Sequence, residues 1–271
     1  EALEDDMDRA RKAILEQLAE LLARAWPDPA NRVRLERDLF PHNRDEAYLV
    51  QDGMHRLLDA AVAGWKVGAT SQKMRELDGH EDVIPGRIFA SRTFVGARHR
   101  LSIDQFPHAR AETEFAFRLL ASPELRQTAW TAEEMASMMI LHPAIELIGN
   151  RFFVDEVSKA ENSLLTIADN GGGIGFVFGD PVADWHDIDF QNHQINLTVG
   201  RRGPAGNFLG DMRCIPAQAA ADLVNHLASR GEVLAAGDFI STGAATVPQT
   251  FAVGDAVAAD FGEIGRIELQ F

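Results

Sequence analysis

The chain has 271 residues, a length typical of one large domain or of a large domain with a smaller N-terminal part. Its 41 acidic and 26 basic residues give a formal net charge of −15, which argues against nucleic acid and anionic membranes as partners. Cys214 is the single cysteine, which excludes an intrachain disulfide framework and a thiolate metal cluster. Neither a signal peptide nor a membrane-spanning apolar run is recognisable, so we expect a cytoplasmic protein.

Two amphipathic helices are expected at the N-terminal end. The first is predicted over residues 1–25 and is ended by Pro27 and Pro29. The second is predicted over residues 45–63. We expect residues 1–63 to form a helical N-terminal segment that packs against a β-rich catalytic domain over residues 64–271. The first helix is predicted from apolar residues at spacings of three and four, namely Met7, Ala10, Ile14, Leu18, Leu21, Leu22 and Ala25.

The character of the chain changes at residues 64–70, where Trp, Val and Thr favour a strand and glycines permit close approach. Lys66 lies inside this apolar segment. It either points to solvent from an edge strand or is desolvated near a cleft, where it would act as an electrostatic clamp or a proton donor.

Residues 111–117 alternate strictly, which predicts a strand with Thr113, Phe115 and Phe117 turned into a core. Glu112 and Glu114 then project from the opposite face, with Cα atoms roughly 6.5–7 Å apart. Like charges that close repel each other unless a cation lies between them, and Mg²⁺ or Mn²⁺ prefers carboxylate oxygens. The alternative is a half-exposed strand with a solvated acidic face.

A third glutamate, Glu146, is more informative about a metal site than Glu112 or Glu114. Thr131 and Glu134 form a capping box that predicts a helix over residues 132–141, which ends before Pro143. Glu146 follows within an apolar strand over residues 142–148. An isolated buried charge there is costly unless it is paired or binds a metal.

Residues 167–175 form a glycine-rich turn, in which Asn170 is followed by three glycines. Exposed backbone amides in such a turn suit a carboxylate ligand, although a flexible hairpin connection explains the same pattern. Strands are further expected over residues 191–199, 238–244, 255–259 and 264–271, and a helix over residues 216–230 begins at Pro216 and stops at Gly231.

Taken in order, seven stretches resemble one family, the 2-keto-4-pentenoate hydratase branch of the fumarylacetoacetate hydrolase superfamily. The resemblance covers about residues 45–271, and the ordered set is specific although no single motif is. The stretches are GWKVGATS, the ETE strand, HPAIELIGNRF, IADNGGG, NHLASRGEVLAAGD, STGAATVP and DFGEIGRIELQF.

The resemblance implies an α+β fold with a rolled β-sandwich core and flanking helices. It also implies Mg²⁺ or Mn²⁺ held by Glu112, Glu114 and Glu146, the glutamates already singled out. Water and a bidentate ligand would complete the metal's coordination shell. The implied ligand is a 2-oxo or 2-hydroxy-dienoic acid that chelates through its carboxylate and its C2 oxygen.

The family's other site residues map onto this chain by motif. Lys66 matches the lysine of the family's GxKxG segment and would stabilise an anion or shuttle a proton. Glu81 is a weaker candidate for the general base. The substrate carboxylate would be held by Asn170 and the amides of Gly171 and Gly172, and Thr242 would donate a hydrogen bond beside the metal.

The implied reaction is hydration of a 2-hydroxy-2,4-dienoate to a 4-hydroxy-2-oxo acid in aromatic-compound catabolism. Gly149, Asn150 and the glycines at 171–173 depart from the family pattern near the expected substrate pocket, so other reactions stay open. These are vinylogous decarboxylation of a 2-oxo-dienedioate of the 4-oxalocrotonate type, C–C bond hydrolysis of an acylpyruvate-like substrate with His80 or Glu81 as base, and a metal-bound subunit without turnover. The resemblance further implies a homo-oligomer and leaves a complex with another pathway enzyme open.

Overall fold

The computed structural model describes residues 2–28 and 30–271, with side chains from Arg9 onward. The expected roles of Met7 and Pro29 therefore lie outside the described part. The helices are α1 (Ala2–Ala25), α2 (Arg44–Leu58), α3 (Gln72–Asp78), α4 (Ala132–Ala136), α5 (Lys159–Ala168) and α6 (Pro216–Ser229). The 3-10 helices are η1 (Arg37–Leu39), η2 (Ala90–Arg92), η3 (Ile103–Gln105), η4 (Asn170–Gly172), η5 (Gly210–Met212) and η6 (Gly262–Ile264).

The strands form three sheets. The largest has the order β3-β2-β11-β6-β7-β9-β4, with β12 also pairing with β6; a second has the order β10-β13-β14-β5; and β1 pairs with β8. The strands are β1 (Val33–Arg34), β2 (Val62–Gly68), β3 (Ile84–Phe89), β4 (Thr93–Val95), β5 (Arg98–Arg100), β6 (Arg110–Leu119), β7 (Met139–Ile148), β8 (Phe152–Phe153), β9 (Gly173–Phe178), β10 (Asn196–Val199), β11 (Phe239–Ala244), β12 (Gln249–Thr250), β13 (Ala256–Asp260) and β14 (Arg266–Gln270).

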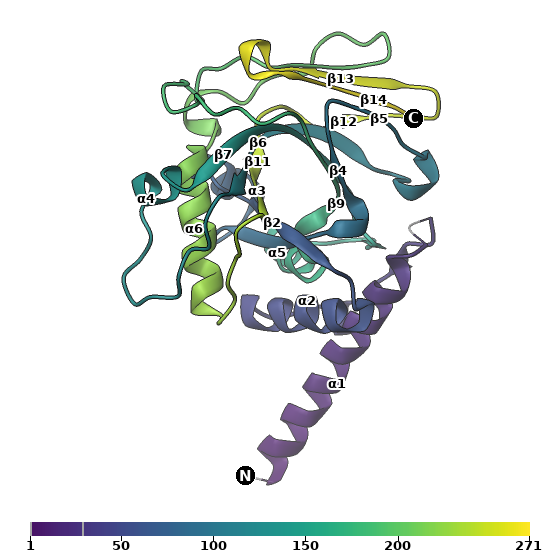
Figure 1. Cartoon of the computed structure of the whole chain (residues 1–271). Helices are drawn as coiled ribbons and strands as arrows, with labels where there is room; N and C mark the ends of the chain where they lie inside the picture. Colours follow the sequence, from purple (N-terminus) through teal and green to yellow (C-terminus); the bar gives the residue numbers. More distant parts are fainter. Residues whose placement is uncertain (1, 29) are drawn as a thin grey trace.

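The large sheet is mixed and curled, and the four-stranded sheet lies over one side of it (Figure 1). Strands β6 and β7 form its long antiparallel centre, whereas β2 and β11 run parallel. Helices α2 and α5 lie on the other side of the sheet, and α6 flanks it (Figure 1). The arrangement confirms the expected α+β class.

Inside the curl, the middle of the sheet is filled by an aromatic cluster. The rings of Phe178 and Phe239 stack with centroids 4.0 Å apart, and Phe176 stacks on Phe178 at 6.2 Å. The small side chains of Ala116 on β6 and Ala144 on β7 belong to the same cluster and leave room for these rings. These side chains form a small apolar cluster of their own within the sheet.

Helix α1 crosses α2 and extends away from the body at its N-terminal end (Figure 1). Its buried face includes Leu15, Leu18 and Leu22, and Arg11 forms an ion pair with Glu46 on α2 at 2.5 Å. The predicted boundary at residue 63 falls inside β2. The division into a helical segment and a catalytic domain stays a prediction. No helix of residues 2–28 and 30–271 is long and apolar enough to cross a membrane.

Several predicted boundaries were wrong. Helix α2 ends at Leu58 rather than at residue 63, because Asp59 takes a left-handed conformation. The helix expected over residues 132–141 stops at Ala136, and the chain enters β7 at Met139 because apolar side chains there join the sheet. Helices α3 and α5 were not predicted, although Ser158 and Glu161 form a capping box at the start of α5.

Candidate metal centre

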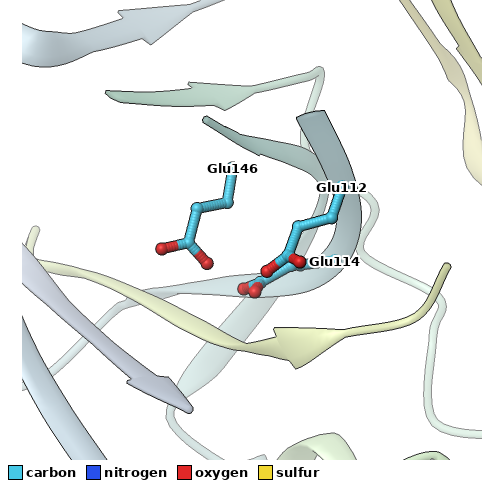
Figure 2. Close-up of side chains that lie close together, drawn as sticks. All are labelled: Glu112, Glu114 and Glu146. Atoms are coloured by element: carbon cyan, nitrogen blue, oxygen red, sulfur yellow. The ribbon is translucent and has the colours of Figure 1, made fainter. Parts of the chain in front are cut away.

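The three glutamates singled out from the sequence come together inside the curled sheet. Glu112 and Glu114 project from β6, and Glu146 projects from β7, where it lies directly opposite Glu112 in the strand register. Figure 2 shows their carboxylates pointing toward one another. One oxygen from each side chain lies within 4.8 Å of the others, and all three residues are buried. The half-exposed, solvated strand of the alternative interpretation is therefore wrong.

The cluster is electrostatically unfavourable on its own. Burial and the neighbouring charge of Glu146 raise the pKa of Glu112 to about 8. The same two causes raise the pKa of Glu114 well above its usual range. Like charges placed directly opposite on paired strands destabilise a sheet, so this arrangement needs positive charge beside it.

Lys66 supplies part of that charge from β2. Its Nζ lies 3.4 Å from Glu146 Oε1 and donates a hydrogen bond of 2.8 Å to the carbonyl oxygen of Gly171. Burial favours the neutral amine, but the carboxylates of Glu146, Glu114 and Glu112 outweigh it and raise the pKa of Lys66. Lys66 is therefore a desolvated cation and does not point to solvent.

The donor set fits a divalent cation. Three carboxylates and one ammonium leave two negative charges, which a divalent cation cancels. Apart from the ion pair of Oε1 with Lys66, no group among the residues that the structure describes contacts the Glu146 carboxylate by a hydrogen bond, although both of its oxygens are buried. Such orphaned acceptors suit a hard cation, which takes oxygen ligands and keeps remaining positions for water or a chelating ligand.

Ser241 is a site residue that sequence reasoning missed. Its hydroxyl donates to Glu114 Oε2, and the backbone N–H of Gly243 donates to the same oxygen at 3.1 Å. Thr242, which was predicted to serve the site, donates its hydroxyl to the carbonyl of Phe115 at 2.5 Å. Alternation along β11 could have indicated this, because it places Ser241 and Thr242 on opposite faces.

The glycine-rich segment packs tightly beneath Lys66. Gly171 and Gly172 have φ values of +69° and +79°, which favour glycine. A Cβ at Gly86 on β3 would lie 2.1 Å from the carbonyl oxygen of Asn170, so glycine is required there as well. The Asn170 amide is engaged with the backbone N–H and C=O of Arg87 at 2.7 and 2.8 Å. It anchors this loop, and its predicted contact with substrate stays untested.

A cleft of about 590 Å³ leads to the carboxylates. Lys66, Glu112, Glu114, Gly171 and Gly172 line it, as does His80, whose Nδ1 lies 2.6 Å from Ser163 Oγ. Glu81 is exposed and is not among the residues that line the cleft, so a role as general base would require a movement of its segment.

Comparisons with known proteins identify relatives in sequence and in fold. No family model matches the sequence. The chain is 28% identical over 214 residues to a 4-oxalocrotonate decarboxylase of a Pseudomonas species, covering 78% of this chain and 79% of the relative. It is 24% identical over 241 residues to the 2-keto-4-pentenoate hydratase of Paraburkholderia xenovorans strain LB400, covering 87% of each.

The fold has close solved counterparts. The 4-oxalocrotonate decarboxylase from Pseudomonas putida G7 was solved with calcium and acetate and with magnesium and adipate, and it superposes with TM-scores of 0.80 and 0.79. The two chains are 22% identical, and the match covers 96% of this chain and 98% of that one.

The curled mixed sheet has the same fold as the solved 4-oxalocrotonate decarboxylase, and the relatives in sequence are enzymes, which supports an enzyme of the fumarylacetoacetate hydrolase superfamily. The chain is similar in sequence to the 2-keto-4-pentenoate hydratases and the 4-oxalocrotonate decarboxylases, and these relatives support the branch of the superfamily that its sequence motifs resemble.

Proposed function

We propose that this protein is a divalent-metal-dependent hydratase that adds water to a 2-hydroxy-2,4-dienoate and gives a 4-hydroxy-2-oxo acid. The observation that carries the proposal is the buried cluster of Glu112, Glu114 and Glu146 with Lys66 beside it. We further propose Mg²⁺ or Mn²⁺ as the ion, because an all-carboxylate donor set matches hard cations.

When bound, the cation supplies Lewis acidity that stabilises negative charge at the substrate's C2 oxygen. The protein's own residues would hold the ion and orient its ligands. The three carboxylates would hold the ion, and Ser241 and the N–H of Gly243 fix the orientation of Glu114.

Lys66 is the proposed proton carrier. Its charged form lies in the wall of the cleft and is fixed by Gly171, so it can donate a proton to the terminal carbon of the dienolate. The proton that the substrate's 2-hydroxyl group loses when the dienolate forms recharges the amine, and water then adds its hydroxyl at C4 and its proton at C3. His80 is the proposed base toward water, because it lines the same cleft and burial lowers its pKa, which keeps the imidazole neutral.

A second candidate function is vinylogous decarboxylation of a 2-oxo-dienedioate. The same enolate forms when carbon dioxide leaves, so the carboxylates and Lys66 serve both reactions equally. Two arginines among the residues that line the cleft, Arg32 and Arg110, favour this candidate, because they suit a substrate with a second carboxylate.

A product assay tests the proposal. Purified protein with Mg²⁺ or Mn²⁺ is given 2-hydroxypenta-2,4-dienoate and, separately, a 2-oxo-hexenedioate, while dienol absorbance and carbon dioxide are followed. Conversion of the dienol to a 4-hydroxy-2-oxo acid without carbon dioxide establishes the hydratase. Carbon dioxide from the diacid moves the assignment to a decarboxylase, and inactivity on both with metal bound contradicts both proposals.

The proposed setting is the cytoplasm, in keeping with a single buried cysteine, Cys214, whose pKa is raised by burial. The proposed assembly is a homo-oligomer, and sedimentation analysis of the purified chain tests it.

A further inference from the structure

Strand β3 lies at the edge of the large sheet, and two side-chain amides bond its free edge. It is the first strand in the sheet order and pairs with β2 on its other side. The Asn170 amide donates to the carbonyl oxygen of Arg87 at 2.8 Å and accepts from the Arg87 N–H at 2.7 Å. Two residues earlier, the carbonyl oxygen of Pro85 accepts a hydrogen bond of 3.0 Å from Gln51 Nε2. The two amides therefore satisfy backbone groups that an edge strand otherwise leaves to solvent or to another chain.

Gln51 also holds the end of the helix that leads to Asn170. It belongs to α2, which packs against α5 (Figure 1). Its Nε2 donates a second hydrogen bond, of 2.8 Å, to the carbonyl oxygen of Ile167 in the last turn of α5. Carbonyl groups in the last turn of a helix lack an intrahelical partner, and a buried one is costly when it stays unbonded. Gln51 is fully buried, so a single amide group ties β3 to the end of α5 from the protein interior.

The loop that follows α5 carries one of two anchors of the Lys66 ammonium group. The carbonyl oxygen of Gly171 accepts the 2.8 Å hydrogen bond from Lys66 Nζ, and a Cβ on Gly171 would lie 3.2 Å from Lys66 Cδ. The other anchor is Glu146, whose Oε1 lies 3.4 Å from Nζ. If the loop shifted, the ion pair with Glu146 would draw the ammonium group away from the position that Gly171 fixes.

We propose that Gln51 is a positioning residue that keeps the Gly171 carbonyl in place and thereby sets the position of the Lys66 ammonium group. The inference rests on the proposed function, in which Lys66 delivers the proton. It gives α2, part of the expected N-terminal helical segment, a role in the active site, although none of the described residues that line the cleft belongs to α2.

The substitution Gln51→Met tests this role. Methionine has nearly the length and volume of glutamine but no donor, so the carbonyls of Pro85 and Ile167 lose their partner. Turnover is measured with the dienol or the diacid of the product assay, whichever the wild-type protein converts. We expect kcat to fall about ten- to a hundredfold, because a misplaced proton donor slows the chemical step. KM and the dissociation constant for Mn²⁺ should stay close to the wild-type values, because the three glutamates come from β6 and β7. A wild-type kcat would overturn the proposal.

Met54→Ala is the matched control for a loss of stability. Met54 lies three residues further along α2, is fully buried, and accepts a hydrogen bond of 3.1 Å from Trp26 Nε1 through its sulfur. The truncation leaves a cavity and should lower the melting temperature about as much as Gln51→Met does. The kcat of this variant should nevertheless stay at the wild-type value. An equal loss of kcat in both variants would assign the effect to stability and contradict a positioning role.

A double variant tests whether Gln51 acts through Lys66. In the Lys66→Met background, Gln51→Met should lower kcat by less than about threefold, since residues that act as a unit have non-additive effects. A further loss of about ten- to a hundredfold, as in the wild-type background, would mean that Gln51 influences the rate by another route and would refute the proposal.

Hydrogen exchange tests the hold on the loop without turnover. The N–H of Asp169 donates to the carbonyl of Leu165 at 2.9 Å, and the N–H of Gly172 donates to the carbonyl of Asp169 at 3.1 Å. Exchange of these two amides should be faster in Gln51→Met than in the wild type and should be unchanged in Met54→Ala. Wild-type exchange in Gln51→Met would overturn the proposal.

The outcomes separate the positioning role from the proposed function. A wild-type protein that binds metal but converts neither substrate contradicts the proposed function. In that case faster exchange in Gln51→Met would still support the hold of Gln51 on the loop, and unchanged exchange would contradict it. A converted substrate with an unchanged kcat in Gln51→Met contradicts the positioning role and leaves the proposed function standing.

Discussion

The ammonium group of Lys66 lies 3.4 Å from Glu146 Oε1, and both side chains are buried. Strand β2 carries the lysine and β7 carries the glutamate, with β11 and β6 between them in the sheet order. The contact therefore depends on the curl of the sheet, which brings the two strands to face each other across its interior. Lys66 balances part of the charge of the carboxylates and also stands beside the substrate cleft.

Replacing Lys66 by Met separates these two roles. The variant keeps most of the side chain's volume, so with Mg²⁺ present we expect a folded protein. Turnover should fall about 10²- to 10⁴-fold, the range for loss of a general acid–base group. Binding of Mn²⁺ should become tighter, because a positive charge has been removed next to the ligands. Turnover close to that of the wild type, measured at saturating metal, would leave Lys66 with a structural role only.

Replacing Glu146 by Gln tests the carboxylate cluster as a metal site. In the wild-type protein, metal at a hundredfold its dissociation constant should add about 2.7 kcal/mol of stability. This corresponds to a rise in melting temperature of about 5–10 °C for a chain of this size. Glu146→Gln should abolish that rise and the bound metal, measured by thermal unfolding and elemental analysis. Glu156→Gln, a change at an exposed glutamate, should preserve both.

The site was predictable where strict alternation fixed the side-chain direction. The period of two over residues 111–117 set Glu112 and Glu114 on one face, and the cost of burying Glu146 pointed to a partner. That these three carboxylates meet followed only from the family resemblance, because pairing of β6 with β7 is a long-range contact. Helix α6 was predicted well, since Pro216 and Gly231 mark its ends chemically.

The missed features depend on tertiary packing. Helix α3 has seven residues, too few for hydrophobic periodicity to indicate it. Ser241 lies opposite Ala116 in the pairing of β11 with β6, and the register shifts between Ser241 and Ala244, which lies opposite Glu114. The register between distant strands cannot be inferred from either segment alone.

Asp169 gives the protein a pH-dependent element outside the metal cluster. Its Oδ2 accepts a hydrogen bond from the Arg151 backbone N–H at 2.7 Å, and within the described part of the chain its Oδ1 has no partner. Burial raises the pKa of Asp169 from its ordinary value of 3.8 to about 7, against the opposing effect of Arg151. The folded protein therefore holds a proton that the unfolded chain releases between these two pH values.

Because the pKa of Asp169 is higher in the folded protein than in the unfolded chain, the stability of the protein falls as the pH rises. The stability contributed by the protonated carboxyl is fully present below about pH 4 and is lost as the pH rises through about 7. Asp169→Asn keeps an acceptor for the Arg151 N–H but does not titrate. The melting temperature of the variant should therefore rise relative to that of the wild type as the pH is raised from 4 to 8 at constant metal concentration. A difference between the two proteins that stays constant over this range would refute the assignment.

Gly173, the first residue of β9, tests how closely the carboxylate cluster is packed. A Cβ at this position would lie 2.6 Å from Glu146 Oε1 and 2.7 Å from the Phe176 ring, both far inside van der Waals contact. Its φ of −78° is open to any residue, so an effect of Gly173→Ala would come from these contacts and not from backbone strain. We expect Glu146 to be displaced and the dissociation constant for Mn²⁺ to rise at least tenfold, measured by titration.

In Gly203→Ala the added Cβ meets no heavy atom within 4 Å, so Mn²⁺ affinity should stay at the wild-type value. Wild-type affinity in Gly173→Ala would mean that Glu146 is not held where metal binding needs it.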